Sequence, residues 1–449
     1  MFIPHTDVER QEMLKTIGKK ELSELFNVIP EEFRYPELDI PPALSEMEAQ
    51  QQFSNLADAN NACDEMACFL GAGAYNHYVP ATVDFLLHRG EFFTAYTPYQ
   101  PEISQGTLQA IFEFQSLIAN LTGMDIANAS HYDGATAAAE ACISAYHHFR
   151  GKRPKLVLSP NLNPQYLETI HTYFGMLDGS KLLVPEEQTA FSDPDQLATL
   201  VDDQTALILM QYPDFLGNIY DLTALTTKAH EQGALVAVSV NPIALGLLKP
   251  PADFGVDFVV GEGQPLGIPM SFGGPYLGFF ATRKELVRKI SGRIVGETVD
   301  GQGQRGYVLT LTAREQHIRR EKATSNICTN QGLMALAATI YLSLLGKSGL
   351  RQVAELCYHK AHYAAQQIAG LEGYKLINNQ PFFNEFVVEC PKNVSVINQH
   401  MLEHGLIGGY DLEKSYPKLK NQMLVAVTEL NSREEIDLLV DLLEEARHE

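Results

Sequence analysis

Between about residues 124 and 290, short runs of apolar residues alternate with longer segments in which apolar residues recur every three or four positions. The short runs predict strands, and the longer segments predict helices. The expected strands span residues 155–159, 181–184, 206–211, 235–240, 258–260 and 277–281, and the expected helices span residues 135–149, 166–176, 195–201 and 222–232. Because strands and helices alternate and the strands are apolar throughout, the pattern predicts a parallel sheet with helices on both faces.

The two ends of the chain follow different patterns. Residues 1–60 are polar and mostly helical in pattern, with a proline-rich break at residues 35–42. A long helix is expected around residues 330–345, and the last hundred residues predict a small α+β domain after it. Its expected strands are 384–389 and 423–428, with a helix at 395–404. A final helix is expected to start from a capping box of Ser432 and Glu435. We therefore expect three parts: a helical arm (1–65), a large α/β domain (66–325), and the long helix with the small domain (326–449).

Charge and composition narrow the classes of partner. The chain has 449 residues and a formal net charge of −22, which argues against nucleic acid and against an anionic membrane surface as partners. No apolar run approaches the roughly 18 residues that indicate a membrane-spanning helix, and the first residues do not resemble a secretory signal. Six cysteines are scattered without a Cys-x-x-Cys pair, as expected of thiols in a reducing compartment. We expect a cytoplasmic protein.

The most informative position for chemistry is Gln264. Residues 257–275 have the layout of the lysine loop of a pyridoxal-phosphate enzyme: a short apolar strand, the key position, and a Gly-Gly-Pro turn. A lysine amine at the key position bonds to the cofactor and then moves protons. An amide can do neither, because its nitrogen lone pair is delocalised into the carbonyl. The chain is therefore expected to be half of an enzyme whose chemistry lies on a partner.

Two other cofactor anchors were sought in the sequence. A pyridoxal site needs a carboxylate at the end of the strand at residues 235–240, to keep the pyridine nitrogen protonated, but Asn241 follows this strand. The turn at residues 131–136 leads into an alanine-rich helix whose start could approach a phosphate, although such turns are also ordinary tight helix starts. Two of the three anchors are therefore missing, and the third is ambiguous.

Four further patterns in the sequence could mark a functional site. Residues 312–329 gather arginines and hydroxyls, which could donate to an oxyanion or form a solvated helix end. Residues 92–102 form an aromatic loop with two prolines, which could line a site or be a rigid buried loop. The Gly-x-Gly-x-x-Gly pattern at 301–306 is expected to follow no strand and open no helix, so a polar loop is favoured over a dinucleotide site. The histidines, including the pair at 147–148, show no metal-ligand spacing.

Four long motifs then resemble one known family. Residues 69–80, 94–105, 261–278 and 314–329 are similar to those of the glycine dehydrogenase (decarboxylating) family, the P-protein of the glycine cleavage system. The resemblance covers nearly the whole chain. The length is about half that of the single-chain form, and the motifs are those of its N-terminal half, so the chain is similar to the separately encoded α form of that half.

The resemblance implies a fold, a cofactor and partners. The implied fold is that of the fold-type-I, aminotransferase-like pyridoxal-phosphate enzymes, with the cofactor lysine in the C-terminal half or β subunit. Pyridoxal 5′-phosphate would be held covalently by that β subunit and not by this chain. The α–β complex, an α2β2 tetramer in split forms, would decarboxylate glycine and pass an aminomethyl group to the lipoyl arm of H-protein. T-protein and L-protein belong to the same system.

Fold geometry in the family also implies site residues. Thr324 and Ser325 would donate to the phosphate of the partner's cofactor, and Tyr96, Thr97 and Tyr99 would lie near the substrate or lipoyl entrance. No catalytic base and no metal site are expected on this chain. Two other hypotheses remain: an inactive scaffold or regulator of the same fold, and an autonomous enzyme using Lys249, which lies on the wrong side of the strand at 258–260 for that role. Activity that depends on the β subunit would indicate the family's decarboxylase and not an inactive scaffold or regulator.

Overall fold

The structure is a computed structural model that describes residues 5–62, 65–175, 177, 179–185 and 193–448. It divides into two compact units, Met1–Asn61 and Ala62–Glu449, which are described separately. The first unit consists of helices α1 (Asp7–Thr16) and α2 (Glu46–Ala57) with short 3₁₀ turns at Leu22–Phe26 and Glu31–Phe33. Capping boxes built on Thr6 and Ser45 start the two helices, because each side chain accepts a bond from a free amide of the first turn.

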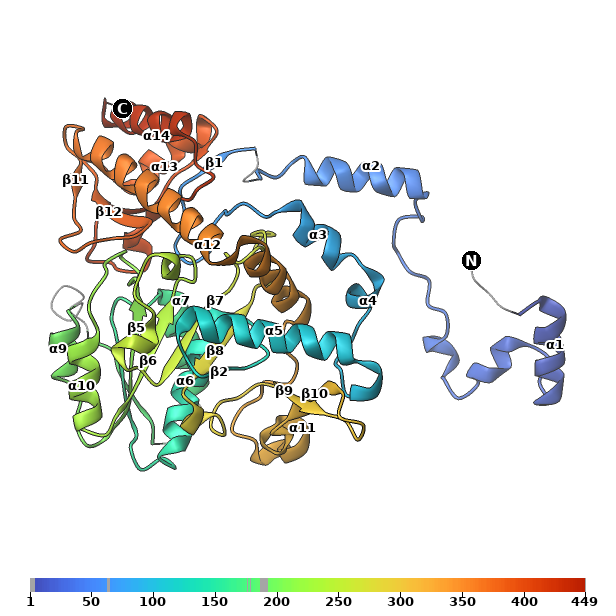
Figure 1. The fold of residues 1–449 in the computed structure, drawn as a ribbon. Coiled ribbons are helices and arrows are strands. Elements are labelled where there is room, and N and C mark those ends of the chain that lie inside the picture. Colours follow the sequence, from blue (N-terminus) through green and yellow to red (C-terminus); the bar gives the residue numbers. More distant parts are fainter. Residues whose placement is uncertain (1–4, 63–64, 176, 178, 186–192, 449) are drawn as a thin grey trace. The chain divides into compact units, whose positions relative to one another are not determined.

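A seven-stranded sheet forms the centre of the second unit (Figure 1). Its strand order is β2-β8-β7-β6-β5-β3-β4. The bounds are β2 (Ile126–Ala127), β3 (Lys155–Leu158), β4 (Lys181–Leu183), β5 (Thr205–Tyr212), β6 (Leu235–Val240), β7 (Phe258–Glu262) and β8 (Gly278–Thr282). All six predicted strands are present. Strands β3 to β7 are parallel, whereas β8 runs antiparallel to β7 because no crossover helix separates them.

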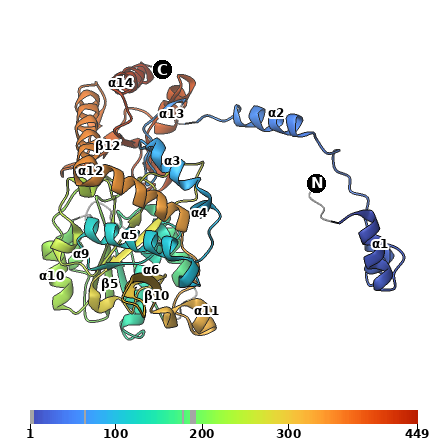
Figure 2. The ribbon, with the colours of Figure 1, turned by 45° about the vertical axis from the view of Figure 1, so that its right-hand side comes forward.

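Helices cover both faces of this sheet, as Figures 1 and 2 show. Alternate residues of β5 point to opposite cores: Leu207 and Leu209 to one, Ile208 and Met210 to the other. The first core is closed by α6 (Gly134–His148) and α7 (Pro164–Phe174). The second is closed by α5 (Gln105–Thr122), α9 (Pro194–Ala198), α10 (Thr223–Glu231) and the start of α12. This is the predicted doubly covered α/β sheet.

The long helix α12 (Gly332–Ala369) connects this sheet to a smaller α+β layer. It extends well past the predicted end near residue 345 and kinks at Gly346, which has φ 59°. By length and composition alone α12 could cross a membrane, but core helices pass the same test, and α12 packs against α5 and α14. The layer contains a four-stranded sheet and two helices: β11 (Lys375–Leu376), β12 (Glu385–Glu389), β14 (Tyr410–Asp411), β15 (Gln422–Ala426), α13 (Val394–Glu403) and α14 (Arg433–His448).

Short elements complete the second unit and include one that the sequence analysis missed. Strands β9 (Ile294–Val299) and β10 (Arg305–Thr310) form an antiparallel hairpin. The Gly-x-Gly-x-x-Gly pattern is the turn of this hairpin, so the expectation that it follows no strand was wrong. A dinucleotide site is still disfavoured, because β10 rather than a helix comes next. The other elements are β1 (Ala67–Cys68) paired with β13 (Leu406–Ile407), α3 (Ala81–Leu87), α4 (Gly90–Phe93) and α11 (Gln316–Arg319).

Candidate functional site

A small pocket lies at the carboxyl ends of β5, β6 and β7, where open α/β sheets bind ligands. It is lined by Gly73, Tyr75, Asn163, Tyr166, Gln211, Ser239, Val240, Asn241, Pro242, Glu262 and Pro265. Its volume is about 30 Å³. A water molecule needs roughly 10–15 Å³, whereas sites for small molecules have volumes of about 300–1,000 Å³. The pocket therefore has room for two or three waters and not for an organic cofactor.

Gln264 is buried beside this pocket and fully hydrogen-bonded. Its side-chain oxygen accepts a bond of 2.9 Å from the amide nitrogen of Tyr75. Its side-chain nitrogen donates to the carbonyl oxygens of Tyr75 (2.9 Å) and Ile268 (2.8 Å). An amide can satisfy both kinds of partner because it carries an acceptor and donors, whereas an ammonium group only donates. At the position expected for the cofactor lysine, the chain thus has a side chain that ties two backbone segments together.

The carboxylate of Glu262 occupies the start of helix α6. Its oxygens accept bonds of 2.9 Å from the backbone amides of Gly134, Gln264 and Leu277. Burial raises the pKa of Glu262 to about 7, although the three amide donors lower it. A Cβ at Gly134 would lie 2.1 Å from the hydroxyl oxygen of Tyr166, so only glycine fits this close approach. At the start of α6, where a phosphate could have bound, the Glu262 carboxylate therefore already accepts the bond from the Gly134 amide.

The pocket does not fit pyridoxal phosphate. Asn241 uses its side-chain oxygen to accept bonds from the amides of Ile243 and Ala244, as a local turn cap. It supplies no negative charge for a pyridine nitrogen. The chain has no lysine at position 264 and no acid at position 241. The start of α6 is already bonded to Glu262, and the pocket has little free volume. Each anchor of the cofactor is therefore absent or already hydrogen-bonded within the chain.

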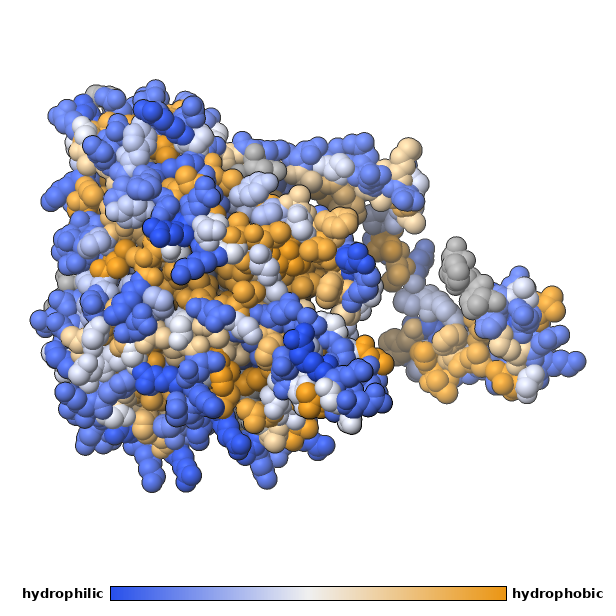
Figure 3. Space-filling model, in the orientation of Figure 1, coloured by the Kyte–Doolittle hydropathy of each residue, from blue (hydrophilic) through white to orange (hydrophobic). Residues whose placement is uncertain are grey.

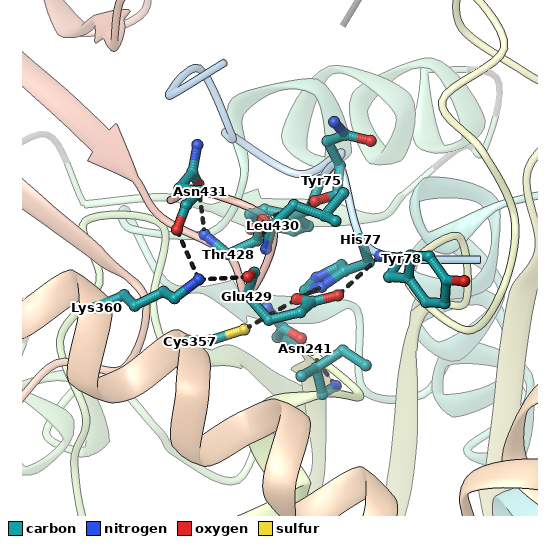
Figure 4. Close-up of polar contacts among 12 residues, drawn as sticks. Tyr75, His77, Tyr78, Asn241, Cys357, Lys360, Thr428, Glu429, Leu430 and Asn431 are labelled. Carbon is teal, nitrogen blue, oxygen red and sulfur yellow. Dashed lines mark hydrogen bonds and ion pairs between the residues drawn. The ribbon is translucent and has the colours of Figure 1, made fainter. Parts of the chain in front are cut away.

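The segment at residues 69–80 is held by two buried acids from the C-terminal layer. Glu385 accepts bonds from the Tyr75 hydroxyl (2.7 Å) and the amide of Ala72 (2.8 Å), and burial raises its pKa to about 7. Glu429 accepts from the His77 ring (2.7 Å), the amide of Tyr78 (2.8 Å) and the thiol of Cys357 (3.4 Å), as Figure 4 shows. Sequence reasoning missed this network, because its partners lie more than 300 positions apart or on separate elements.

The group of His77, Cys357 and Glu429 also has the residue types of a zinc site, with ligand atoms within 4.8 Å of one another. Two ligands about 2.0–2.1 Å from a tetrahedral zinc ion lie roughly 3.3 Å apart. The His77–Glu429 distance of 2.7 Å is instead that of a hydrogen bond. The ammonium of Lys360 donates to the carbonyl oxygens of Glu429 and Asn431 and adds a positive charge nearby (Figure 4). The group is best described as a hydrogen-bonded anchor.

Two of the three residues predicted near the entrance, Tyr96 and Thr97 but not Tyr99, line a different pocket of about 270 Å³, between the loop after α4, helix α5 and the start of α12. Tyr96 is 79% exposed. The buried guanidinium of Arg293 donates to the hydroxyls of Thr97 and Tyr99, at 3.3 Å each. The loop is thus neither wholly buried nor free, because Arg293 fixes two of its residues and leaves Tyr96 open to solvent.

Thr324 and Ser325 line a third pocket, which shares no lining residue with that of Tyr96 and Thr97. Thr324 is exposed. The Ser325 hydroxyl donates to Glu140 at 2.7 Å and accepts from the amide of Ile327 at 3.0 Å. A hydroxyl has one hydrogen to donate, so a bond from Ser325 to a phosphate would require the bond to Glu140 to be exchanged.

Comparison with solved structures defines the class of protein. Sphingosine-1-phosphate lyase from Burkholderia pseudomallei superposes with a TM-score of 0.65 at 14% identity, covering 93% of this chain and 94% of the other. Glutamate decarboxylase from Lactobacillus brevis gives 0.67 at 13%, covering 96% and 97%. These likenesses show the fold alone, and they confirm the predicted fold-type-I, aminotransferase-like architecture.

Closer comparisons define the family. Residues 1–443 match the family described as glycine cleavage system P-protein, and the chain belongs to that family. Proteins named probable glycine dehydrogenase (decarboxylating) subunit 1 are 55% identical in Thermomicrobium roseum, over 99% of both chains, and 53% identical in Desulforamulus reducens, over 98% of both. A solved structure described as glycine decarboxylase (P-protein) of the glycine cleavage system, in inhibitor-bound form, is 42% identical with a TM-score of 0.91, covering 99% of this chain and 100% of that one.

Proposed function

We propose that this chain is the cofactor-lysine-free subunit of an enzyme that decarboxylates glycine, active only in complex with a second subunit that carries pyridoxal phosphate. The observation that carries the proposal is Gln264, an internally bonded amide at the position of the cofactor lysine, within the fold of pyridoxal-phosphate enzymes. The relatives are named subunit 1, which supports an enzyme built from two different chains. The bound cofactor supplies the electron sink that decarboxylation of an amino acid needs.

The outer surface of this chain supports a role in assembly. Figure 3 shows apolar side chains gathered across one face of the second unit. Phe93, Tyr96 and Ile103 are 58%, 79% and 81% exposed, respectively. Contiguous exposed apolar patches on soluble proteins mark sites of association. We propose that this face, with the Tyr96–Tyr99 loop, meets the second subunit near the substrate or lipoyl entrance.

The wider assembly follows from the same proposal. The complex would be an α2β2 tetramer, H-protein would receive the aminomethyl group on its lipoyl arm, and T-protein and L-protein would complete the system in the cytoplasm. The net charge of −22 supports an assembly without nucleic acid. Thr324, exposed and with a free hydroxyl among the described contacts, is the better supported of the two proposed donors to the partner's cofactor phosphate.

Reconstitution tests the function. Glycine–bicarbonate exchange is expected to be near zero for this chain alone, and to rise on titration of the second subunit with this chain until it saturates at one-to-one. The physical reason is that this chain has no lysine amine for the cofactor, whereas the second subunit alone has an incomplete site at the interface. Each subunit alone is the control. Full activity of the second subunit by itself would make this chain a scaffold or regulator instead.

The proposed phosphate donors give a second test. Changing Thr324 and Ser325 together to alanine, in the complex, should weaken cofactor retention at least ~10-fold, because each hydrogen bond to a charged acceptor contributes roughly 1.5–3 kcal/mol. Retention is measured by equilibrium dialysis of the cofactor, and assembly by sedimentation. The matched control removes the exposed hydroxyls of Thr169 and Thr172, which bond only to their own helix. Unchanged retention would leave residues 324–325 as a helix-start segment without a ligand.

A further inference from the structure

The pocket beside Thr324 and Ser325 has a charge opposite to that of the molecule as a whole. It has a volume of about 560 Å³, within the range of small-molecule sites, and lies between the end of α6, residues 288–292 and residues 315–327. The chain has 55 acidic and 33 basic residues, so a random surface region should be acidic. Among the described residues that line this pocket, one side chain is acidic, Glu315, whereas three are arginines and one is a lysine: Arg150, Arg288, Arg319 and Lys289.

The four basic side chains are available to a ligand. Within the part of the chain that the structure describes, no ion pair or side-chain hydrogen bond engages Arg150, Arg288, Lys289 or Arg319. Cations gathered around a concave surface focus the electrostatic field and raise the local concentration of anions. Arginine and lysine are also the side chains that recognise phosphate, the former in a bidentate manner.

A buried hydroxyl in the wall of the same pocket points to a ligand independently of charge. Ser144 is 3% exposed, and among the described residues its hydroxyl oxygen has no hydrogen-bond partner. Buried hydroxyls in proteins are nearly always bonded, because leaving one unpaired costs free energy. Ser144 belongs to helix α6 and lines the pocket, as does Arg150, which follows the end of that helix at His148.

We propose that this pocket binds a small molecule carrying phosphate groups, with Arg150, Arg288, Lys289 and Arg319 as charge partners and the Ser144 hydroxyl as a donor. The site shares no lining residue with the small pocket beside Gln264. It includes Thr324 and Ser325, the proposed donors to the partner's cofactor, but the four cations and Ser144 have no part in that contact, so the proposal is tested on the free chain. A free small molecule is favoured over an acidic segment of a partner protein, because a segment crossing the surface would not require a cavity of about 560 Å³.

Pyrophosphate is the probe, and the protein is the full-length chain alone. Isothermal titration should show saturable one-to-one binding that weakens as salt rises, because phosphate contacts are screened. Changing Arg150 and Arg288 together to alanine should weaken binding at least ~10-fold, since two charge-assisted bonds are lost. Lys347→Ala, an exposed cation on α12 away from the pocket, should leave binding unchanged.

The variant Ser144→Ala distinguishes a role of this hydroxyl in ligand binding from a role in the stability of the fold. Ser144→Ala should leave the melting temperature of the free chain unchanged or slightly raised, because the hydroxyl has no partner to lose, while weakening pyrophosphate binding severalfold. Equal binding by the arginine double variant and the parent chain, or no saturable binding by the parent, would overturn the proposal.

Discussion

Lysine at position 264 is expected to destabilise the chain by about 3–5 kcal/mol and to yield no cofactor-bearing enzyme. The amide of Gln264 is 1% exposed and serves one donor and two acceptors of the backbone. A lysine there would bury a positive charge and leave the amide of Tyr75 without an acceptor. The cofactor would gain nothing, because Asn241 still provides no acid and the pocket remains about 30 Å³ in volume.

The experiment on Gln264→Lys has two readouts. Urea unfolding of the full chain at pH 7 measures the loss of stability, and borohydride treatment with pyridoxal phosphate measures any lysine-linked cofactor. Gln399→Lys is the matched control, because Gln399 is exposed on α13 beside Glu403 and its change should alter stability by less than ~0.5 kcal/mol. A stoichiometric lysine-linked cofactor on the variant, or unchanged stability, would show that the pocket can still accept the cofactor.

The sheet could be predicted from the sequence because its strands are buried on both faces. Runs such as residues 206–210 are apolar at every position, as expected of a parallel strand covered on both faces. The β9–β10 hairpin was missed because its strands are exposed at one end, so Glu297 and Arg305 interrupt the apolar pattern. Helix α12 continues beyond the predicted end near residue 345, because the chain kinks at Gly346 and remains helical to residue 369.

The candidate site could be predicted only where it depends on residues that are neighbours in the sequence. Gln264 and Asn241 follow their strands directly, so the absence of cofactor anchors was visible in the sequence. The contacts that close the pocket were not visible. Glu262 meets Gly134 across 128 positions, and Tyr75 meets Glu385 across 310. Folding alone brings such pairs together, and the sequence shows no spacing that reports them.

The second large effect concerns pH: the free energy of unfolding should fall as pH rises from about 5 to 7. Burial raises the pKa of Glu140, Glu262 and Glu385 to about 7 and that of Asp214 to about 6. The folded chain therefore keeps protons at a pH where the unfolded chain, with carboxyl pKa values near 4–4.5, has released them. At these four carboxyls the folded state binds more protons, so removing protons favours unfolding in this window. His147, His148 and His362, whose pKa burial lowers, act in the opposite direction, and the four acids are expected to outweigh them. A shift from 4.5 to about 7 corresponds to roughly 3 kcal/mol for one group.

Urea unfolding at pH 5, 6, 7 and 8 measures this fall, and Glu140→Gln assigns part of it to one residue. Glutamine keeps an oxygen that accepts the hydrogen bond of Ser325 but cannot ionise, so the variant should lose stability less steeply with pH than the parent chain. Glu113→Gln is the control, because Glu113 is exposed on α5, and its profile should follow that of the parent. The acids whose pKa is lowered, Glu429 among them, do not reverse the trend, because their stabilising effect is complete above pH 4.5. A flat profile, or one that rises from pH 5 to 7, would show that the buried acids are ionised in the folded chain and that their amide and hydroxyl donors outweigh burial.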